Sequence, residues 1–156
     1  MARVNVGVNP KYLADQHLIA ESVEITMITG GLRKNGYEIK SPVPLKFKLG
    51  TGHINFFKNK IFYLKLRLGE VNEEMRRRNF NPGTRLILAE YPEKLINDWD
   101  PDFEASNLIR SRIIERLKFP LNGKKGSDYY RYRSKLIGSD MDRFCEELLD
   151  SELYSV

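Results

Sequence analysis

The chain has 156 residues, with 26 basic and 21 acidic side chains, two histidines and a single cysteine. One cysteine excludes an internal disulfide, and with two histidines it cannot complete a Cys/His zinc site. The sequence lacks both an apolar run of the ~20 residues that a membrane span needs and a signal-peptide core, so we expect one soluble, cytoplasmic domain.

The net charge of +5 is unevenly distributed along the chain. Residues 140–156 hold six acids and one base, which leaves residues 1–139 with 25 bases and 15 acids. A surplus of this size is the electrostatic footprint of a protein that binds a polyanion. The alternative is an ordinary solvated surface with an acidic tail that aids solubility.

The pattern favours helices joined by loops. A first, largely buried helix is predicted from Asn9-Pro10 to Ile28 and ends at Gly30-Gly31. The following loop, from Gly30 to Thr51, carries five bases and one acid. A loop of this length is usually functional or disordered, so Arg33 and Lys34 either lie along phosphates or belong to a floppy basic loop.

A second helix is indicated by apolar residues that recur at spacings of three and four. They are Ile54, Phe57, Ile61, Leu64, Leu68, Val71 and Met75. Lys58, Lys60, Lys65 and Arg67 are expected mostly off this stripe. The triplet 76–78 (Arg-Arg-Arg) closes the last turn, where cations complement the helix dipole, and Asn81-Pro82-Gly83 breaks the helix.

A third helix is predicted to begin at Asp100-Pro101-Asp102 and to stop before Pro120, with Arg112 and Arg116 on it. The segment Tyr129–Lys135 alternates rings with cations, which suits either stacking on bases or a small aromatic packing patch. Ser139 and Asp142 resemble a capping box for a short acidic tail helix. The sequence shows no convincing strand series.

Near the amino terminus the residues suggest amine chemistry. The small Ala2 allows removal of Met1, and a free α-amine beside a carboxylate can attack a sugar carbon and form a Schiff base. Glu24 lies seven residues after His17, so the two share a face of the first helix. A buried Glu24 needs a donor, which the Ala2 amine or Arg3 could supply; otherwise Glu24 is partly exposed and ordinary.

Three segments of the chain resemble the phage-type pyrimidine-dimer DNA glycosylases, the UV endonuclease V family. The segments are residues 3–25 (RVN…LADQHLIAE…EI), 47–57 (FKLGTGHINFF) and 78–81 (RNFN). The resemblance is strong over residues 1–81, weaker at Glu104-Ala105-Ser106, and continues in the Tyr129–Lys135 segment. Residues 140–156 resemble an extension beyond the family's usual end.

The resemblance implies an all-α, compact single-domain fold with three main helices, long basic loops and a short acidic C-terminal helix. It places a glycosylase/lyase domain at residues 1–139, and it requires no metal or cofactor. The implied substrate is double-stranded DNA with damaged bases, bound by a monomer, in the host cytoplasm if the protein is viral. No membrane is implied as a partner.

The implied reaction uses the α-amine of Ala2 as nucleophile at C1′ of the damaged nucleotide and Glu24 as the catalytic carboxylate. The base leaves, an imine forms, and β-elimination nicks the strand. The candidate residues for substrate or DNA binding are Arg3, Gln16, His17, Arg33, Lys34, His53, Arg112, Arg116, Tyr129, Tyr130, Arg131, Tyr132 and Lys135.

Two positions depart from the family pattern. Val23 and Met27 stand where the family usually has arginines that hold phosphates, so DNA binding should weaken and lose part of its salt dependence. We therefore expect a glycosylase and abasic-site lyase acting on a UV pyrimidine dimer. The alternatives are the same chemistry on another modified base, or a DNA-binding protein without catalysis, and the acidic tail suggests a protein-interaction or self-shielding role.

Overall fold

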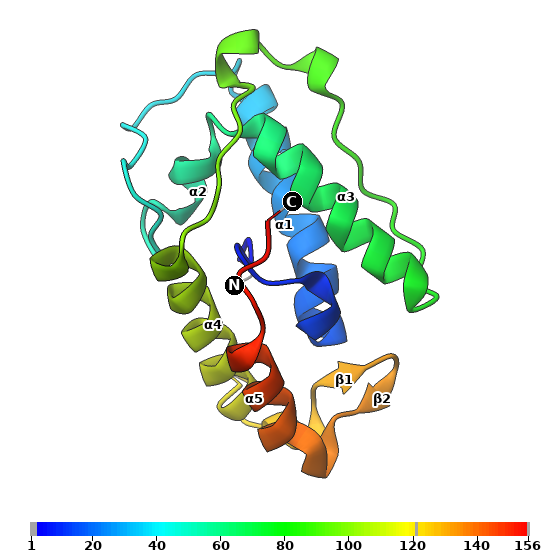
Figure 1. Ribbon diagram of the computed structural model, residues 1–156. Coiled ribbons are helices and arrows are strands. Elements are labelled where there is room, and N and C mark those ends of the chain that lie inside the picture. The colour runs from blue at the N-terminus through cyan, green and yellow to red at the C-terminus, as the bar shows by residue number, and fades with distance from the viewer. Residues whose placement is uncertain (1–2, 121, 156) are drawn as a thin grey trace. The chain divides into compact units, whose positions relative to one another are not determined.

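The computed structural model describes residues 3–120 and 122–155, and these form a predominantly helical protein, as predicted (Figure 1). The elements in chain order are α1 (Asp15–Lys34), α2 (His53–Phe57), α3 (Ile61–Arg77), α4 (Phe103–Lys118), β1 (Arg131–Tyr132), β2 (Lys135–Leu136) and α5 (Met141–Asp150). The chain folds as two compact units. Among the described residues, one comprises residues 3–4 and 20–100, and the other comprises residues 5–19, 101–120 and 122–155.

Helix α1 differs from its prediction at both ends. Pro10–Tyr12 forms a separate 3₁₀ turn, and α1 itself begins at Asp15 and runs through Gly30-Gly31 to Lys34. Its end is built at Gly36, where φ is +66° and the Tyr37 N–H donates to the Leu32 carbonyl at 2.8 Å. This is a Schellman cap, for which a glycine in the left-handed region is preferred.

The predicted second helix is two helices. It breaks between Phe57 and Ile61, where Lys60 leaves helical geometry (φ −126°, ψ 45°) and its Nζ donates to the Phe56 carbonyl at 2.8 Å. The apolar stripe is confirmed from Ile61 to Met75, but Ile54 is 40% exposed. Helix α3 ends at Arg77, and Asn79 (φ +63°) turns the chain away before the predicted Asn-Pro-Gly break.

In the first unit, α3 packs against the part of α1 from Ala20 onward, and the buried faces of both helices carry charge. Arg67 lies inside this contact, contrary to the prediction that it sits off the stripe. Its Nε donates to Glu21 at 2.6 Å and a second guanidinium nitrogen donates to the same carboxylate at 3.0 Å. The pairing explains the burial, because a buried guanidinium needs a hydrogen-bonded counter-charge.

The first unit also contains a cluster of rings around α2. The Trp99 ring lies 4.9 Å from that of Phe56 and 5.2 Å from that of Tyr63, both edge to face. Phe57 and Phe47 complete the cluster. Edge-to-face aromatic pairs add about 0.5–1.5 kcal/mol each beyond area burial, so the short helix α2 is anchored by its rings.

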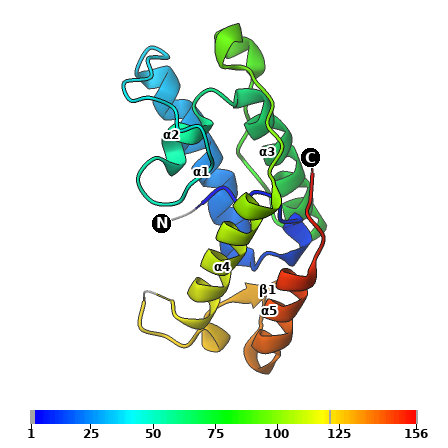
Figure 2. The same ribbon diagram turned by 60° about the vertical axis from the view of Figure 1, so that its left-hand side comes forward.

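In the second unit, α4 begins two residues later than predicted, because its cap is Asp102 and not Asp100. Asp102 is its N-cap and accepts the Ala105 N–H at 2.8 Å, although Pro101 precedes the cap and does not occupy the first helical position. Helix α5 packs on α4 (Figure 2). The predicted capping box before α5 is wrong, because Ser139 lies in a 3₁₀ turn and no side chain caps α5.

One buried arginine joins α4 to the C-terminal segment. Arg110 donates to the carbonyls of Leu148 and Ser151, both at 2.7 Å, and to those of Glu152 at 3.0 Å and Gly7 at 3.1 Å. Gly7 has φ +71°, and a Cβ there would lie 2.7 Å from the Cβ of Ser106, so only glycine fits. The segment from Leu148 to Glu152 is thus tied to α4 within the second unit.

The expectation of no strands is also corrected. β1 and β2 form a two-stranded antiparallel hairpin inside the Tyr129–Lys135 segment, with Tyr132 opposite Lys135. Its two turn residues, Arg133 and Ser134, have φ of +50° and +69°. A two-residue turn of this kind suits the twist of a hairpin but normally selects glycine or asparagine, so Arg133 and Ser134 do not predict it.

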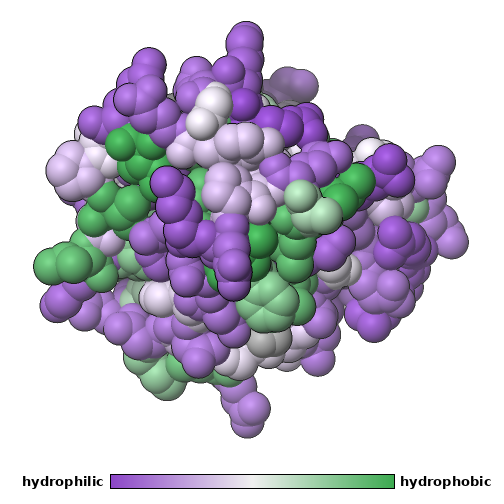
Figure 3. Space-filling model, turned by 90° about the horizontal axis from the view of Figure 1, so that it is seen from above, coloured by the Kyte–Doolittle hydropathy of each residue, from purple (hydrophilic) through white to green (hydrophobic). Residues whose placement is uncertain are grey.

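The surface is mostly hydrophilic with apolar side chains set among polar ones, as the view in Figure 3 shows. The apolar side chain with the greatest exposure among the described residues is Leu45, which is fully exposed, and Met27 is 64% exposed. None of the helices within residues 3–120 and 122–155 combines the length and apolar character needed to cross a membrane.

Candidate functional site

Glu24 lies on α1 in the first unit and is 6% exposed, so its carboxylate is buried rather than part of an ordinary helix surface. Burial raises the pKa of this carboxyl, and the nearby positive charge of Arg3 lowers it. The position therefore combines poor solvation with a cationic neighbour. That is an environment in which a carboxylate can respond strongly to new positive charge on a bound substrate.

The N-terminal segment is held in the first unit by His53, the first residue of α2. The Val4 N–H donates to Nε2 of His53 at 3.2 Å, and Nδ1 of the ring lies 3.0 Å from the Lys48 carbonyl. Because Nε2 accepts, Nδ1 carries the proton and donates to Lys48. His53 is 2% exposed, which places it in the core and not on a surface that could touch DNA directly.

Two apolar side chains flank Glu24 on the exposed side of α1. Val23 is 46% exposed and Met27 is 64% exposed. They are four residues apart on one helix, so they lie on the same face. The surface beside the buried carboxylate is therefore apolar at the two positions where the resembling family usually has arginines.

In the second unit, Asp15 holds the hairpin turn. Its two carboxylate oxygens accept the backbone N–H groups of Arg133 at 3.0 Å and Ser134 at 2.7 Å. The carboxylate thereby stabilises the two residues that have positive φ. Sequence reasoning missed this role, since an acid at the first position of a helix is ordinarily explained by the helix dipole.

Gln16 and His17, the next two residues, also contact the Tyr129–Lys135 segment. Gln16 donates to the Tyr129 carbonyl at 2.7 Å and accepts the Arg131 N–H at 3.0 Å. The His17 ring lies 4.8 Å from that of Tyr130, which is 6% exposed. Six of the predicted site residues thus form one cluster within the second unit: Gln16, His17, Arg116, Tyr129, Tyr130 and Arg131.

His17 is the titratable group of this cluster. Burial, together with the positive charge of Arg116, lowers the pKa of His17 to about 4. Its Nδ1 is buried without a hydrogen-bond partner among the described residues. A buried polar atom without a partner is uncommon in a folded protein, so this nitrogen is a place where a substrate or a water molecule could bind.

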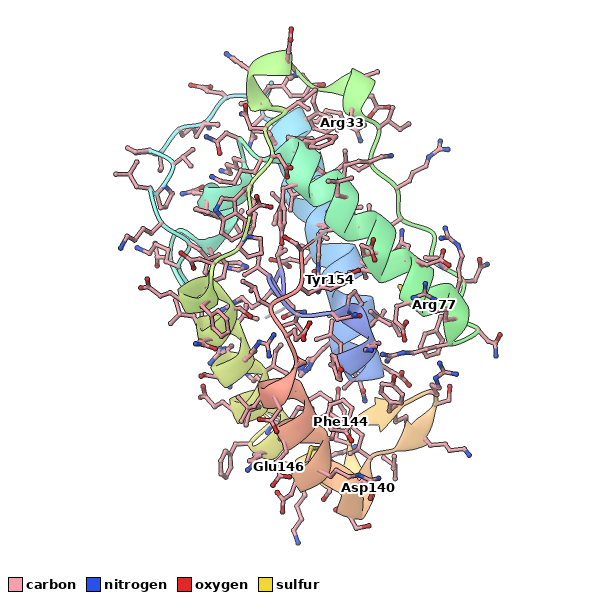
Figure 4. The ribbon with its side chains drawn as sticks, in the orientation of Figure 1. Arg33, Arg77, Asp140, Phe144, Glu146 and Tyr154 are labelled. Atoms are coloured by element: carbon pink, nitrogen blue, oxygen red, sulfur yellow. The ribbon has the colours of Figure 1, made fainter. Side chains whose placement is uncertain are left out.

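A groove of about 500 Å³ in the second unit separates the hairpin from α5. Tyr132, Lys135 and Lys11 line it together with Phe144 of α5, which Figure 4 labels. The Tyr132 hydroxyl donates to the Lys11 carbonyl at 2.7 Å, and its ring packs against Phe144 with centroids 5.8 Å apart. Tyr132 therefore serves packing, while Lys135 stays exposed.

The remaining predicted cations differ in whether they form an ion pair with an acidic side chain. Arg33, near the end of α1 (Figure 4), pairs with Glu90, and Arg112 pairs with Glu115 at 3.4 Å. Lys34 is exposed, as are Arg131 and Lys135. Surface pairs of this kind are worth at most about 1 kcal/mol, so Arg33 and Arg112 remain able to exchange their partners for phosphates.

Ala2, the predicted nucleophile, lies outside the described residues. Within residues 3–120 and 122–155 there is no group of three or more His, Cys, Asp or Glu side chains that could hold a metal ion. The described candidate groups are the Glu24 carboxylate with its neighbour Arg3 in the first unit and, separately, the His17 cluster in the second unit.

A comparison with family models supplies an independent finding. A model described as pyrimidine dimer DNA glycosylase matches residues 1–88, which is more than half of the chain. The match includes Arg3, Glu24 and His53 in the first unit and Gln16 and His17 in the second. It ends before α4, so the Tyr129–Lys135 segment and α5 lie beyond it.

Proposed function

This chain belongs to the pyrimidine dimer DNA glycosylase family, and from that premise we propose that it both releases the damaged base and cuts the strand. The family assignment makes it a DNA repair glycosylase that binds damaged DNA. The proposal adds the nucleophile, the lyase step and the substrate form: the α-amine of Ala2 attacks, and the protein works as a monomer on double-stranded DNA.

In the proposed reaction the neutral α-amine attacks C1′ of the damaged nucleotide, and the C1′–N bond to the base breaks. The base takes the electron pair of that bond and is protonated. Loss of an amine proton and opening of the sugar give an imine between the protein and C1′. Removal of a proton from C2′ then expels the 3′ phosphate by β-elimination, and water hydrolyses the imine to regenerate the amine.

An α-amine suits this role. Its ordinary pKa is about 7.7–8.0, against about 10.4 for lysine, so near neutral pH a sizeable fraction is already neutral and nucleophilic. Lys60 has a pKa lowered by burial, but its Nζ donates to the Phe56 carbonyl and to the Asn59 side chain, which occupies it. Ala2 is therefore the better nucleophile of the two.

The observation that carries the proposal is the buried carboxylate of Glu24 beside the charge of Arg3, within the residues that the family model matches. A carboxylate there stabilises the positive charge that develops on the sugar as the base leaves, and it can pass protons during the imine steps. Oriented donors and charges of this kind typically contribute a factor of about 10² or more in rate.

The test is reductive trapping. The protein is incubated with an abasic-site duplex and borohydride, and the adduct is digested and mapped by mass spectrometry. We expect a covalent adduct at Ala2 in chains that have lost Met1, and none in chains that retain it, because the amine then lies one residue out of place. An adduct at Lys60, or no adduct with a correctly processed terminus, contradicts the proposal.

A second candidate is the same imine chemistry on a different modified base. The exposed apolar pair Val23 and Met27 favours it, because these side chains offer van der Waals contact and no charge for phosphates. Incision of a duplex with a cyclobutane dimer is compared with incision of a panel of other lesions. Cleavage of another lesion without cleavage of the dimer supports the second candidate against the first.

A further inference from the structure

The imidazole of His53 is built into the first unit as a connection between three segments. It belongs to α2, it donates from Nδ1 to the Lys48 carbonyl in the preceding loop, and it accepts at Nε2 from the Val4 backbone. Each ring nitrogen thus forms a hydrogen bond with a main-chain group. The direction of the two hydrogen bonds fixes one neutral tautomer of the ring.

The ring is also fixed by its apolar neighbours. The Phe47 and Phe57 rings lie 5.4 Å and 5.3 Å from it, both edge to face. Burial lowers the pKa of His53 to about 4. At pH 7 the ring is therefore neutral and keeps the lone pair that accepts the Val4 N–H.

The anchored residue lies close, along the chain, to the proposed nucleophile. Two residues of extended backbone span at most about 7 Å, so a restraint on the Val4 nitrogen limits where an amine two residues earlier can go. Arg3, the residue between them, acts electrostatically on both Glu24 and His53. The hydrogen bond from Val4 to His53 therefore restrains the segment that contains Arg3, whose positive charge lowers the pKa of Glu24.

We propose that His53 is a positioning residue, whose Nε2 holds the Val4 backbone so that the N-terminal amine stays in register with the Glu24 carboxylate. The inference rests on the proposed function, because it needs the α-amine to be the nucleophile. It reassigns His53, which the sequence had suggested as a substrate- or DNA-binding residue. The imidazole restricts the position of the amine nucleophile, and it touches no reacting atom.

Two substitutions separate the two hydrogen bonds of the ring. His53→Gln places an amide oxygen near the position of Nε2, so it keeps an acceptor for Val4. His53→Asn is shorter, so it keeps only a group near the position of Nδ1, which can still donate to Lys48. The pair is a matched control, because both variants are neutral amides in the same buried position.

The measured quantities are the single-turnover rate of imine trapping, the KM and kcat for incision, the affinity for abasic DNA, and the midpoint of unfolding. We expect His53→Asn to lower kcat and the trapping rate roughly 10- to 100-fold with little change in KM, because small misplacement of a reacting group has effects of this size. His53→Gln should stay within about threefold of the unsubstituted protein.

Trapping rates that are equal in both variants and the unsubstituted protein overturn the inference. Equal losses in both variants that follow their loss of stability also overturn it, since a purely structural role predicts that result. If His53→Asn does not fold, Val4 is replaced by its α-hydroxy acid, which removes the same N–H while His53 stays intact. The ester chain should then show the slow trapping, and normal trapping by it contradicts the inference.

The two proposals fail in different ways. Absence of an Ala2 adduct in the unsubstituted protein removes the α-amine mechanism itself. A normal Ala2 adduct in the unsubstituted protein, together with an unchanged rate in His53→Asn, leaves the mechanism in place and removes only the positioning role.

Discussion

Glu24 is the residue on which the proposed chemistry depends, and its burial allows a direct test. Glu24→Gln keeps the shape of the side chain and removes its charge. We expect base release and strand incision to fall by about 10²–10⁴-fold, which is the usual range for loss of a positioned acid or base. DNA affinity, measured by fluorescence anisotropy, should change little. Unchanged incision removes Glu24 from the mechanism.

The shifted pKa of Glu24 gives a second residue-scale prediction. Burial raises this pKa, and the carboxylate form is the active one, so activity should fall with decreasing pH at a higher pH than an ordinary carboxyl would cause. Single-turnover rates of abasic-site incision between pH 4 and 8 test this, measured beside DNA affinity at each pH. Glu24→Gln should lack that acidic limb, and an identical limb in the variant assigns it to another group.

At the scale of elements, the contact of α1 with α3 depends on the buried pair of Glu21 and Arg67, whose side chains are 0% and 1% exposed. Arg67→Met removes the guanidinium from the buried Glu21 carboxylate, and we expect it to lower the free energy of unfolding by about 3–5 kcal/mol. The double variant Glu21→Leu/Arg67→Met should recover much of this loss in urea unfolding. Arg76→Met, which breaks an exposed pair with Glu73, should cost less than about 1 kcal/mol.

Helix α5 presents acidic side chains to solvent, of which Figure 4 labels Glu146. If they shield the basic surface, the triple variant Glu146→Gln/Glu147→Gln/Asp150→Asn should bind non-specific DNA roughly three- to tenfold more tightly at low salt. The gain should vanish in high salt, where charges are screened. A control variant neutralises Glu93, Asp98 and Asp100. If both triple variants gain the same affinity for DNA, the gain depends only on net charge, and a specific shielding role for α5 is contradicted.

For the molecule as a whole, His53 makes stability depend on pH in a defined window. Its pKa is about 4 when folded and about 6.5 when unfolded, so between these values the unfolded chain binds a proton that the folded chain does not. The contribution of neutral His53 to the free energy of unfolding is therefore fully present above pH 6.5. It is lost as the pH falls toward 4, by up to about 3 kcal/mol. Urea unfolding from pH 7 to 4.5 measures it. His53→Gln should show a shallower decline, and equal slopes contradict the assignment.

The sequence predicted the parts of this fold that depend on periodicity and missed those that depend on partners distant along the chain. The stripe from Ile61 to Met75 follows from local rules and is confirmed, whereas the start of α4 lies two residues beyond the predicted one, with Asp102 and not Asp100 as the cap. The prediction that α1 ends at Gly30-Gly31 is wrong, because each glycine inside a helix costs only about 1 kcal/mol. The buried Leu32 and the Tyr91 hydroxyl, which donates to the Thr29 carbonyl, favour continuation.

The candidate site shows the same division. The residue pattern leaves open whether Glu24 is buried with a donor or partly exposed, and only the family resemblance implies a catalytic role for it; the structure buries it. His53 could not be assigned its hydrogen bonds, because Val4 is 49 residues away in sequence. The support that Asp15 gives to the hairpin turn spans 118 residues and leaves no local signal.

The contacts of Arg110 have a consequence for how the protein is made. During translation Arg110 is synthesised 38 residues before Leu148 and 42 residues before Glu152, whose carbonyls accept its hydrogen bonds. Until those residues are translated, the guanidinium has, among the described residues, only the Gly7 carbonyl and the Ser106 hydroxyl as acceptors. Most of its hydrogen bonds are then missing, so burying the cation in the second unit is unfavourable. A premature stop codon that removes only the final nine residues should therefore yield a polypeptide that cellular proteases clear, rather than a slightly shorter enzyme.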